Sequence, residues 1–373
     1  MDINYFKAAL SHHSKGNWNK AQEIYQHLLK EDPNNYVVLQ NYGPLLAQLR
    51  EYKLAKDVFI KCLKIKPNDS LLLYNYGKFF HDQKNYEKAI EYYNKSFENN
   101  PKNAMSQYNI GNIYFAQKKF GNAIEKFKKA ASINPNLETI FNNLGLIYLN
   151  LGNKEKAEEN TKKAIKLNPN SSIAYNHLGL IYLNSGNVNE AIASYLKSLK
   201  FNPNNIPANY NLGNLFQRIN DVKNSEKYFN KTLELDPKHL AAYNNLLDLY
   251  DRSNQNEKLE NLLEKSEANF INNSIIDLFK ARLFYKLKKY KEVVQILESI
   301  KFEKNENFKE NIRLELIAKS HDHLGNFKES FYFFEKNNDL TKKTDKNGAN
   351  KDIFLEIINK RIKYFSNLNA SEW

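Results

Sequence analysis

Several features on which whole classes of protein depend are missing from this sequence. Its 373 residues include one cysteine, Cys62, so the chain can form no internal disulfide, which favours a reducing compartment. The longest uncharged apolar run, Leu144 to Leu149, is far shorter than the ~20 residues that cross a bilayer. The first residues show neither the basic nor the apolar segment of a secretion signal. We therefore expect a cytoplasmic protein with no membrane segment.

Catalytic and metal-binding motifs are missing as well. The sequence contains no Gly-x-x-x-x-Gly-Lys phosphate loop, no Gly-x-Gly-x-x-Gly, no His-Glu-x-x-His and no Gly-x-Ser-x-Gly. Histidines cluster at His12 and His13 and at His321 and His323, and residues two apart on a helix face different directions. The sequence therefore predicts no catalytic residue, no cofactor and no metal site in this chain.

Proline is scarce, and its placement is regular. Seven of the nine prolines follow one another at an interval of 34 residues: Pro33, Pro67, Pro101, Pro135, Pro169, Pro203 and Pro237. A proline has no N–H for a helix interior, so each one should end a helix and begin the next repeat. Six of the twelve glycines keep the same interval: Gly43, Gly77, Gly111, Gly145, Gly179 and Gly213. A glycine costs about 1 kcal/mol relative to alanine inside a helix, so its recurrence predicts close approach of a neighbouring helix.

Two further columns have the same period and lie four residues apart. The first holds a small residue: Ala21, Ala55, Ala89, Ala123, Ala157 and Ala191. The second holds an aromatic ring, with Thr161 as the exception: Tyr25, Phe59, Tyr93, Phe127 and Tyr195. Residues four apart share one helix face, so these columns predict a packed core. Polar breaks such as Lys84-Asn85 and Gly152-Asn153 separate the helices, and Gly and Asn tolerate the left-handed conformation that ends a helix.

These columns resemble the tetratricopeptide repeat (TPR), a helix-turn-helix unit of 34 residues. The segments Asn142 to Tyr148 and Asn176 to Tyr182 are especially similar to the family, with Leu-Gly-Leu-Ile-Tyr in both. The resemblance implies an all-α fold, a right-handed TPR α-solenoid (superhelix) of about ten helix-turn-helix units with a C-terminal capping helix. It also implies that the first helix of each unit lines an extended concave groove, where such arrays bind partners.

The regularity decreases toward the C-terminus. We expect seven regular units in residues 2–239, a degenerate unit in 240–273, two degenerate hairpins in 274–344 and a capping helix in 351–367. In the degenerate unit, Leu247 and Leu259 replace the glycine and the alanine. Terminal repeats deviate because their outer faces meet water rather than a neighbour.

One polar column of the first helices could bind a partner. The residue two positions before the glycine position is asparagine in six of seven units, and His177 takes its place in the other: Asn41, Asn75, Asn109, Asn143, Asn211 and Asn245. A carboxamide has an acceptor oxygen and two N–H donors, so this asparagine column can pair with the backbone of an extended peptide. One helical turn further, the same face carries Lys78, Asn112 and Asn214. The alternative is that the column reflects the abundance of asparagine in this chain.

The asparagine column resembles the ladder in the superhelical groove of O-linked N-acetylglucosamine transferases, which implies broad recognition of extended polypeptides. A second resemblance covers residues 310–368, where Leu324-Gly325-Asn326-Phe327 begins a segment similar to the one that joins repeats to catalysis in bacterial TPR sulfotransferases. The phosphate-cradling loop of that catalytic domain does not occur before Trp373.

Two other kinds of binding deserve comparison. A dicarboxylate clamp needs a cation and asparagines from adjacent repeats, and Lys78 with Asn41 and Asn75 would supply part of one. The net charge of +13 would suit nucleic acid. However, lysines such as Lys129 and Lys163 are interleaved with glutamate on second helices, and the rings keep core spacing instead of forming a stacking platform. We therefore do not expect nucleic acid as a partner.

The sequence as a whole predicts a protein-protein interaction scaffold with no enzymatic activity of its own. Its groove would bind extended peptide or protein segments through the asparagine column. The alternative hypothesis is a substrate-recruiting, non-catalytic arm of a TPR-containing transferase, either a sulfotransferase or an O-linked N-acetylglucosamine type, whose catalytic domain is not in this chain.

Overall fold

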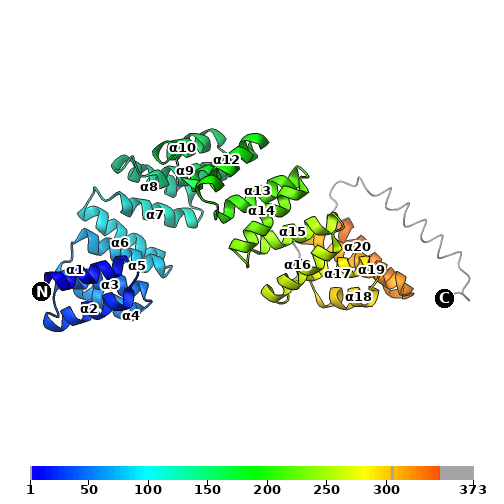
Figure 1. Ribbon diagram of the computed structural model, residues 1–373, viewed down its shortest axis with the longest axis horizontal. Helices are drawn as coiled ribbons and strands as arrows, with labels where there is room; N and C mark the ends of the chain where they lie inside the picture. Colours follow the sequence, from blue (N-terminus) through cyan, green and yellow to red (C-terminus); the bar gives the residue numbers. More distant parts are fainter. Residues whose placement is uncertain (1, 304–305, 345–373) are drawn as a thin grey trace, which may run out of the picture. The chain divides into compact units, whose positions relative to one another are not determined.

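The computed structural model describes residues 2–303 and 306–344, and the regular structure in that part of the chain is helical (Figure 1). The helices alternate as first and second members of hairpins. The first helices are α1 (Ile3–Ser14), α3 (Tyr36–Gln48), α5 (Ser70–Asp82), α7 (Ala104–Ala116), α9 (Glu138–Asn150), α11 (Ser172–Asn184), α13 (Ile206–Arg218), α15 (Leu240–Arg252), α17 (Ser274–Lys286) and α19 (Asn307–His323). The second helices are α2 (Trp18–Glu31), α4 (Tyr52–Ile65), α6 (Tyr86–Asn99), α8 (Phe120–Ile133), α10 (Lys154–Leu167), α12 (Val188–Phe201), α14 (Val222–Leu235), α16 (Asn256–Asn269), α18 (Tyr290–Ser299) and α20 (Phe327–Thr344).

The chain divides into two compact units, Met1–Ala208 (unit 1) and Asn209–Trp373 (unit 2). Consecutive helices pack on one another from α1 to α12 in unit 1 and from α14 to α20 in unit 2, so neighbouring hairpins within a unit contact each other. This is the nearest-neighbour packing of an all-α TPR solenoid, as predicted. The capping helix expected at 351–367 lies outside the described residues.

Residues that follow the periodic prolines fix where the first helices begin. Asn35 accepts a hydrogen bond from the Val38 N–H (3.2 Å), and Asp69 accepts one from the Leu72 N–H (2.9 Å). Each of these caps stands two residues after a proline. A capping side chain of this kind stabilises a helix by about 1 kcal/mol. Proline and cap together therefore end one repeat and start the next.

The turn within each hairpin contains one residue in the left-handed region. That residue is glycine at Gly152 and Gly186, as the sequence suggested. In the Lys84-Asn85 break, however, the left-handed residue is Lys84, with φ of 60°, and not the asparagine. Asn85 instead accepts a hydrogen bond from the Lys88 N–H (3.3 Å) and caps α6. Asn85 therefore begins the second helix, whereas in the equivalent turn Asn220 is itself left-handed, with φ of 61°.

In five of the regular hairpins a glycine of the first helix lies against a ring of the second. Ala9 takes the place of the glycine in the first hairpin, and Thr161 takes the place of the ring in the hairpin of α9 and α10. A Cβ added to Gly179 would lie 2.5 Å from Cε1 of Tyr195, and one added to Gly213 would lie 2.6 Å from Cδ1 of Phe229. Only a residue without a side chain fits there, which confirms the predicted close approach. The rings that fill this position in the repeats of unit 1 are fully buried: Tyr25, Phe59, Tyr93, Phe127 and Tyr195.

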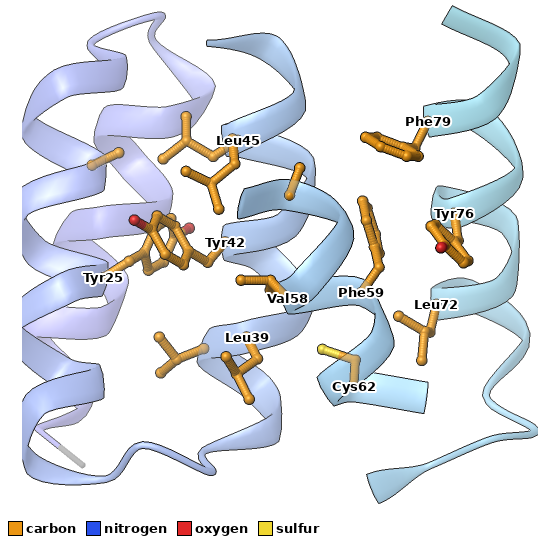
Figure 2. Close-up of a cluster of buried hydrophobic side chains, with 14 of the residues drawn as sticks. Tyr25, Leu39, Tyr42, Leu45, Val58, Phe59, Cys62, Leu72, Tyr76 and Phe79 are labelled. Atoms are coloured by element: carbon orange, nitrogen blue, oxygen red, sulfur yellow. The ribbon is translucent and has the colours of Figure 1, made fainter. Parts of the chain in front are cut away.

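The same rings also connect successive hairpins. Phe59 reaches from α4 toward α5, where it stacks on Tyr76 with ring centroids 5.0 Å apart and lies 5.5 Å from Phe79 (Figure 2). Its other edge lies 3.2 Å from the position of a Cβ on Gly43. One ring thus fixes both the separation of the helices in its own hairpin and the position of the next hairpin.

Two later hairpins of unit 2 replace the glycine and the ring together. In the hairpin of α15 and α16 the equivalent residues are Leu247 and Leu263, and in the hairpin of α17 and α18 they are Ala281 and Leu297. All four are buried in the unit 2 core. In these two hairpins a leucine on the second helix, in place of the ring, leaves room for a side chain on the first.

Replacing Gly179 with alanine should destabilise the hairpins around it. Its Cβ would overlap the Tyr195 ring, and overpacking costs about 1–3 kcal/mol, which exceeds the ~1 kcal/mol that alanine gains as the better helix former. Adding Tyr195→Leu should recover part of the loss, because the double variant has the pair found at Ala281 and Leu297. Urea unfolding followed by far-UV circular dichroism measures both single variants and the double variant.

Gly121 provides the matched control for this cycle. It lies in α8 with no atom within 4 Å of a Cβ added to it, so Gly121→Ala should stabilise the protein by up to ~1 kcal/mol. The effects of Gly179→Ala and Tyr195→Leu should be coupled by about 1 kcal/mol or more. Strict additivity of those two effects would show that the glycine and the ring do not constrain each other.

Candidate functional site

The first helices lie on the inner side of each unit. Between helices that are not consecutive in the chain, the main contacts all join first helices: α1 with α3, α3 with α5 and α9 with α11 in unit 1, and α15 with α17 and α17 with α19 in unit 2. First helices of neighbouring hairpins therefore lie closer to one another than the second helices do. The asparagine column and the residues one turn on either side of it lie on these helices, and we call this surface the first-helix face.

The asparagine column is half-buried on the first-helix face in both units. In unit 1, the Asn109 carboxamide donates a hydrogen bond to the Tyr74 hydroxyl of the preceding repeat (2.9 Å). The Asn143 carboxamide donates to the Asn112 side-chain oxygen (2.8 Å) and to the Tyr108 hydroxyl (3.5 Å). The structure thus brings Asn112 and Asn143 together, as members of one network between adjacent repeats.

Unit 2 contains the same arrangement. The Asn245 carboxamide donates to the Tyr210 hydroxyl (3.3 Å) and to the side-chain oxygen of Asn214, both in the preceding repeat. Asn211 is half-buried in the same column. Recurrence of one hydrogen-bond network in both units shows that the column also has a structural role: its N–H groups join neighbouring first helices.

The tyrosines of this network were missed from the sequence. Tyr74, Tyr108 and Tyr210 each stand one residue before a member of the asparagine column. Their recurrence in phase with the 34-residue repeat was the available signal. It was hidden because tyrosine is abundant in this chain and rings were read as core residues.

The remaining predicted residues of unit 1 differ in their contacts. The Asn41 carboxamide donates to the Val37 carbonyl of its own helix (2.8 Å). Asn75 has no hydrogen-bond partner among the described residues. Lys78 is exposed one turn after it. Asn75 and Lys78 are therefore the members of the predicted site that are least involved in intramolecular contacts.

His177 takes the place of asparagine in α11 and behaves differently. Its Nδ1 is buried without a hydrogen-bond partner among the described residues. Burial lowers the pKa of His177 to about 4, so the ring is neutral at pH 7. The column therefore carries no charge at this point, although histidine could have supplied one.

One hollow on the surface lies away from the predicted site. It has a volume of about 650 Å³ and lies on the side of the second helices, next to α4. Its lining residues are Asn34, Asp57, Ile60, Lys61, Lys64 and Ile65. None of them belongs to the first-helix face.

In the described part of the chain, no helix has the length and apolar character to cross a bilayer.

Comparison with known families identifies the class of protein. Family profiles described as tetratricopeptide repeat match residues 4–35, 36–69, 139–171, 161–193 and 206–239, and one described as TPR repeat matches 77–118, 111–152 and 179–220. These matches cover more than half of the chain. The chain belongs to the tetratricopeptide repeat family, and its fold and family support a role as a protein-interaction scaffold.

Solved structures of similar fold include three multi-helix repeat proteins. Cut9-Hcn1, a hetero-tetramer of the APC/C, is 17% identical with a TM-score of 0.54, covering 74% of this chain and 54% of that one. PilF of Pseudomonas aeruginosa is 20% identical with a TM-score of 0.50, covering 58% of this chain and 97% of that one. PilW, a type IV pilus biogenesis factor, is 20% identical with a TM-score of 0.50, covering 56% of this chain and 96% of that one. At these identities the likeness shows the fold.

No curated protein matches the chain. The comparisons do not bear on the resemblances to sulfotransferases and to O-linked N-acetylglucosamine transferases, which stay predictions.

His177 should make the protein less stable in mild acid. In the unfolded chain a histidine has a pKa of about 6.5, so between pH 6.5 and pH 4 the unfolded state binds the proton that the folded state excludes. Stability is therefore complete above pH 6.5 and falls as the pH drops toward 4. Replacing His177 with asparagine should reduce the loss between pH 7 and pH 5 by about 2 kcal/mol.

Urea midpoints at pH 7 and pH 5 measure this difference for the parent, for His177→Asn and for a control, His27→Asn, at an exposed histidine of α2. The control corrects for the removal of one titratable group. An equal acid effect in parent and His177→Asn would mean that His177 accepts a proton without cost in the folded state.

Proposed function

We propose that this protein is an interaction scaffold whose first-helix face binds extended polypeptide segments through the asparagine column. The observation that supports this most directly is the continuity of the column. In unit 1 a hydrogen-bonding side chain recurs at one phase in every repeat from Asn41 to His177 and remains partly accessible. An extended peptide needs partners for its backbone at regular intervals, and a solenoid provides them because each repeat adds one.

The network between repeats leaves the carboxamide oxygens able to accept hydrogen bonds from a ligand. The Asn143 carboxamide donates its N–H groups to Asn112 and Tyr108, and its side-chain oxygen has no donor partner among the described residues. A peptide N–H can donate to that oxygen. Asn109 uses one N–H on Tyr74 and retains the other N–H and its oxygen. The column therefore suits a ligand that offers backbone N–H groups in particular, which refines the two-way pairing expected from the sequence.

The same network lowers the cost of binding. Ordering a flexible side chain at an interface costs about 0.5–1.5 kcal/mol. The hydrogen bonds of Asn109 to Tyr74 and of Asn143 to Tyr108 and Asn112 hold these carboxamides in place before a ligand arrives. The structural role of the column and its proposed binding role thus support each other.

Replacing Asn75 and Asn109 together with alanine should weaken peptide binding without loss of folding. Each lost hydrogen bond is worth about 1 kcal/mol, so the dissociation constant should rise about tenfold or more. Alanine is the better helix former, so helix stability is retained. The probe is a set of dodecapeptides selected on the parent from a random phage-displayed library and measured by fluorescence anisotropy.

Asn99 and Asn160 are matched control positions. Both lie on second helices and donate a hydrogen bond to the carbonyl four residues before them (2.8 Å each), as Asn41 does. The double variant Asn99→Ala, Asn160→Ala should bind the selected peptides like the parent. If the first-helix variant retains parental affinity for every selected peptide, peptide binding through the column is wrong.

A further inference from the structure

The first-helix face of unit 1 carries an exposed aliphatic column beside the asparagines. Its members stand one helical turn before each asparagine, and in four of five repeats they are large apolar residues: Val37, Leu71, Met105 and Ile173, with Thr139 in the remaining repeat. Their exposed fractions are 45% for Val37, 57% for Leu71, 38% for Met105 and 58% for Ile173. Single exposed apolar residues are ordinary on a protein surface. Here, however, an exposed apolar residue recurs at the same position of successive repeats, so these residues form a stripe.

The same face is almost without charge. The aliphatic column, the asparagine column and the positions three and seven residues after each asparagine, taken from Asn41 to His177, contain two charged residues, Lys78 and Asp82. These two have opposite charge and stand four apart on α5. Burial keeps His177 neutral, since its pKa is lowered to about 4. Charged residues make up 26% of the chain, so this face is strongly depleted of them.

The repeat spacing determines how a ligand could follow the stripe. The first helices α3 and α5, and likewise α9 and α11, contact each other, and helices packed side by side lie about 8–10 Å apart. A polypeptide in the polyproline II conformation advances about 3.1 Å per residue with three residues per turn, so every third side chain points the same way at intervals of about 9 Å. This conformation makes no internal hydrogen bonds, so its N–H groups are available to the asparagine column.

We infer that the first-helix face of unit 1 recognises an uncharged, extended segment in a polyproline II-like conformation, with an aliphatic side chain at every third residue. This inference rests on the proposed function and specifies its ligand. The aliphatic side chains of the ligand cover Leu71, Met105 and their equivalents, while the intervening backbone meets the asparagines. A carboxylate-rich tail or a nucleic acid is excluded as the occupant because Lys78 alone faces it with positive charge.

Three synthetic 15-residue peptides test the ligand class on the full chain. The first repeats Leu-Thr-Gln five times. The second has the same composition with its leucines contiguous, and the third replaces every leucine with glutamate. Fluorescence anisotropy should give the first peptide an affinity at least tenfold higher than the other two. Its affinity should be unchanged between 50 mM and 500 mM salt, because the contact is uncharged.

Two double variants assign the binding to the stripe. The double variant Leu71→Ser, Met105→Ser removes exposed apolar side chains from the first-helix face. It should lower the affinity for the periodic peptide at least fivefold. Ile60→Ser, Leu196→Ser removes side chains of similar exposure, 38% and 44%, from second helices and should leave the affinity unchanged. Circular dichroism confirms that both variants fold.

The outcomes separate this inference from the proposed function. Equal affinity for the periodic and the contiguous peptide, or no effect of Leu71→Ser, Met105→Ser, would overturn the ligand class. If the library instead yields charged peptides whose binding depends on Asn75 and Asn109, the ligand class is wrong and the proposed function stands. Loss of binding of the periodic peptide in both Leu71→Ser, Met105→Ser and Asn75→Ala, Asn109→Ala would support the ligand class and the proposed function together.

Discussion

The contact between a helical glycine and a buried ring is the constraint on which this structure depends. It sets how closely the two helices of a hairpin approach, since a Cβ at Gly179 would lie 2.5 Å from the Tyr195 ring. The ring then contacts the next hairpin, as Phe59 does with Tyr76. One contact repeated in phase therefore positions each hairpin relative to its neighbours. Once helices are placed at a fixed repeat, any residue that recurs in phase becomes a continuous surface feature.

The fold could be predicted because its signals are local and periodic. Pro33 and Gly43 with their equivalents mark helix ends and close approach by conformational rules that need no knowledge of neighbours. The position of the asparagine column followed from the same phase. The hydrogen bonds of Asn109 and Asn143 to tyrosines did not, because they join residues 35 apart, whose distance is set by packing between repeats. The left-handed Lys84 was missed because the turn imposes that conformation whatever residue is present.

Under the proposed function, one side chain of the asparagine column both stabilises the solenoid and binds the ligand. A carboxamide has both donors and an acceptor, so its N–H groups can join adjacent first helices while its oxygen remains available. A lysine in this column could donate hydrogen bonds but could not accept one. Abundance of asparagine in the chain explains neither the in-phase tyrosines Tyr108 and Tyr210 nor the recurrence of the same network in both units.

Unit 2 departs from this pattern in its packing and in the chemistry of its inner face together. Where leucine replaces the glycine and the ring, the first helices acquire ion pairs. Arg252 binds Asp248 (2.9 Å), and the buried Asp251 carboxylate binds Arg282 (2.6 Å) and Lys286 (2.7 Å). An uncharged peptide would remove solvent from the exposed members of these pairs, such as Arg252, at a cost that hydrogen bonds to its backbone would not offset. We therefore assign the proposed recognition of an uncharged segment to unit 1, while ion pairs join the first helices α15 and α17 of unit 2, where the glycine and the ring are replaced.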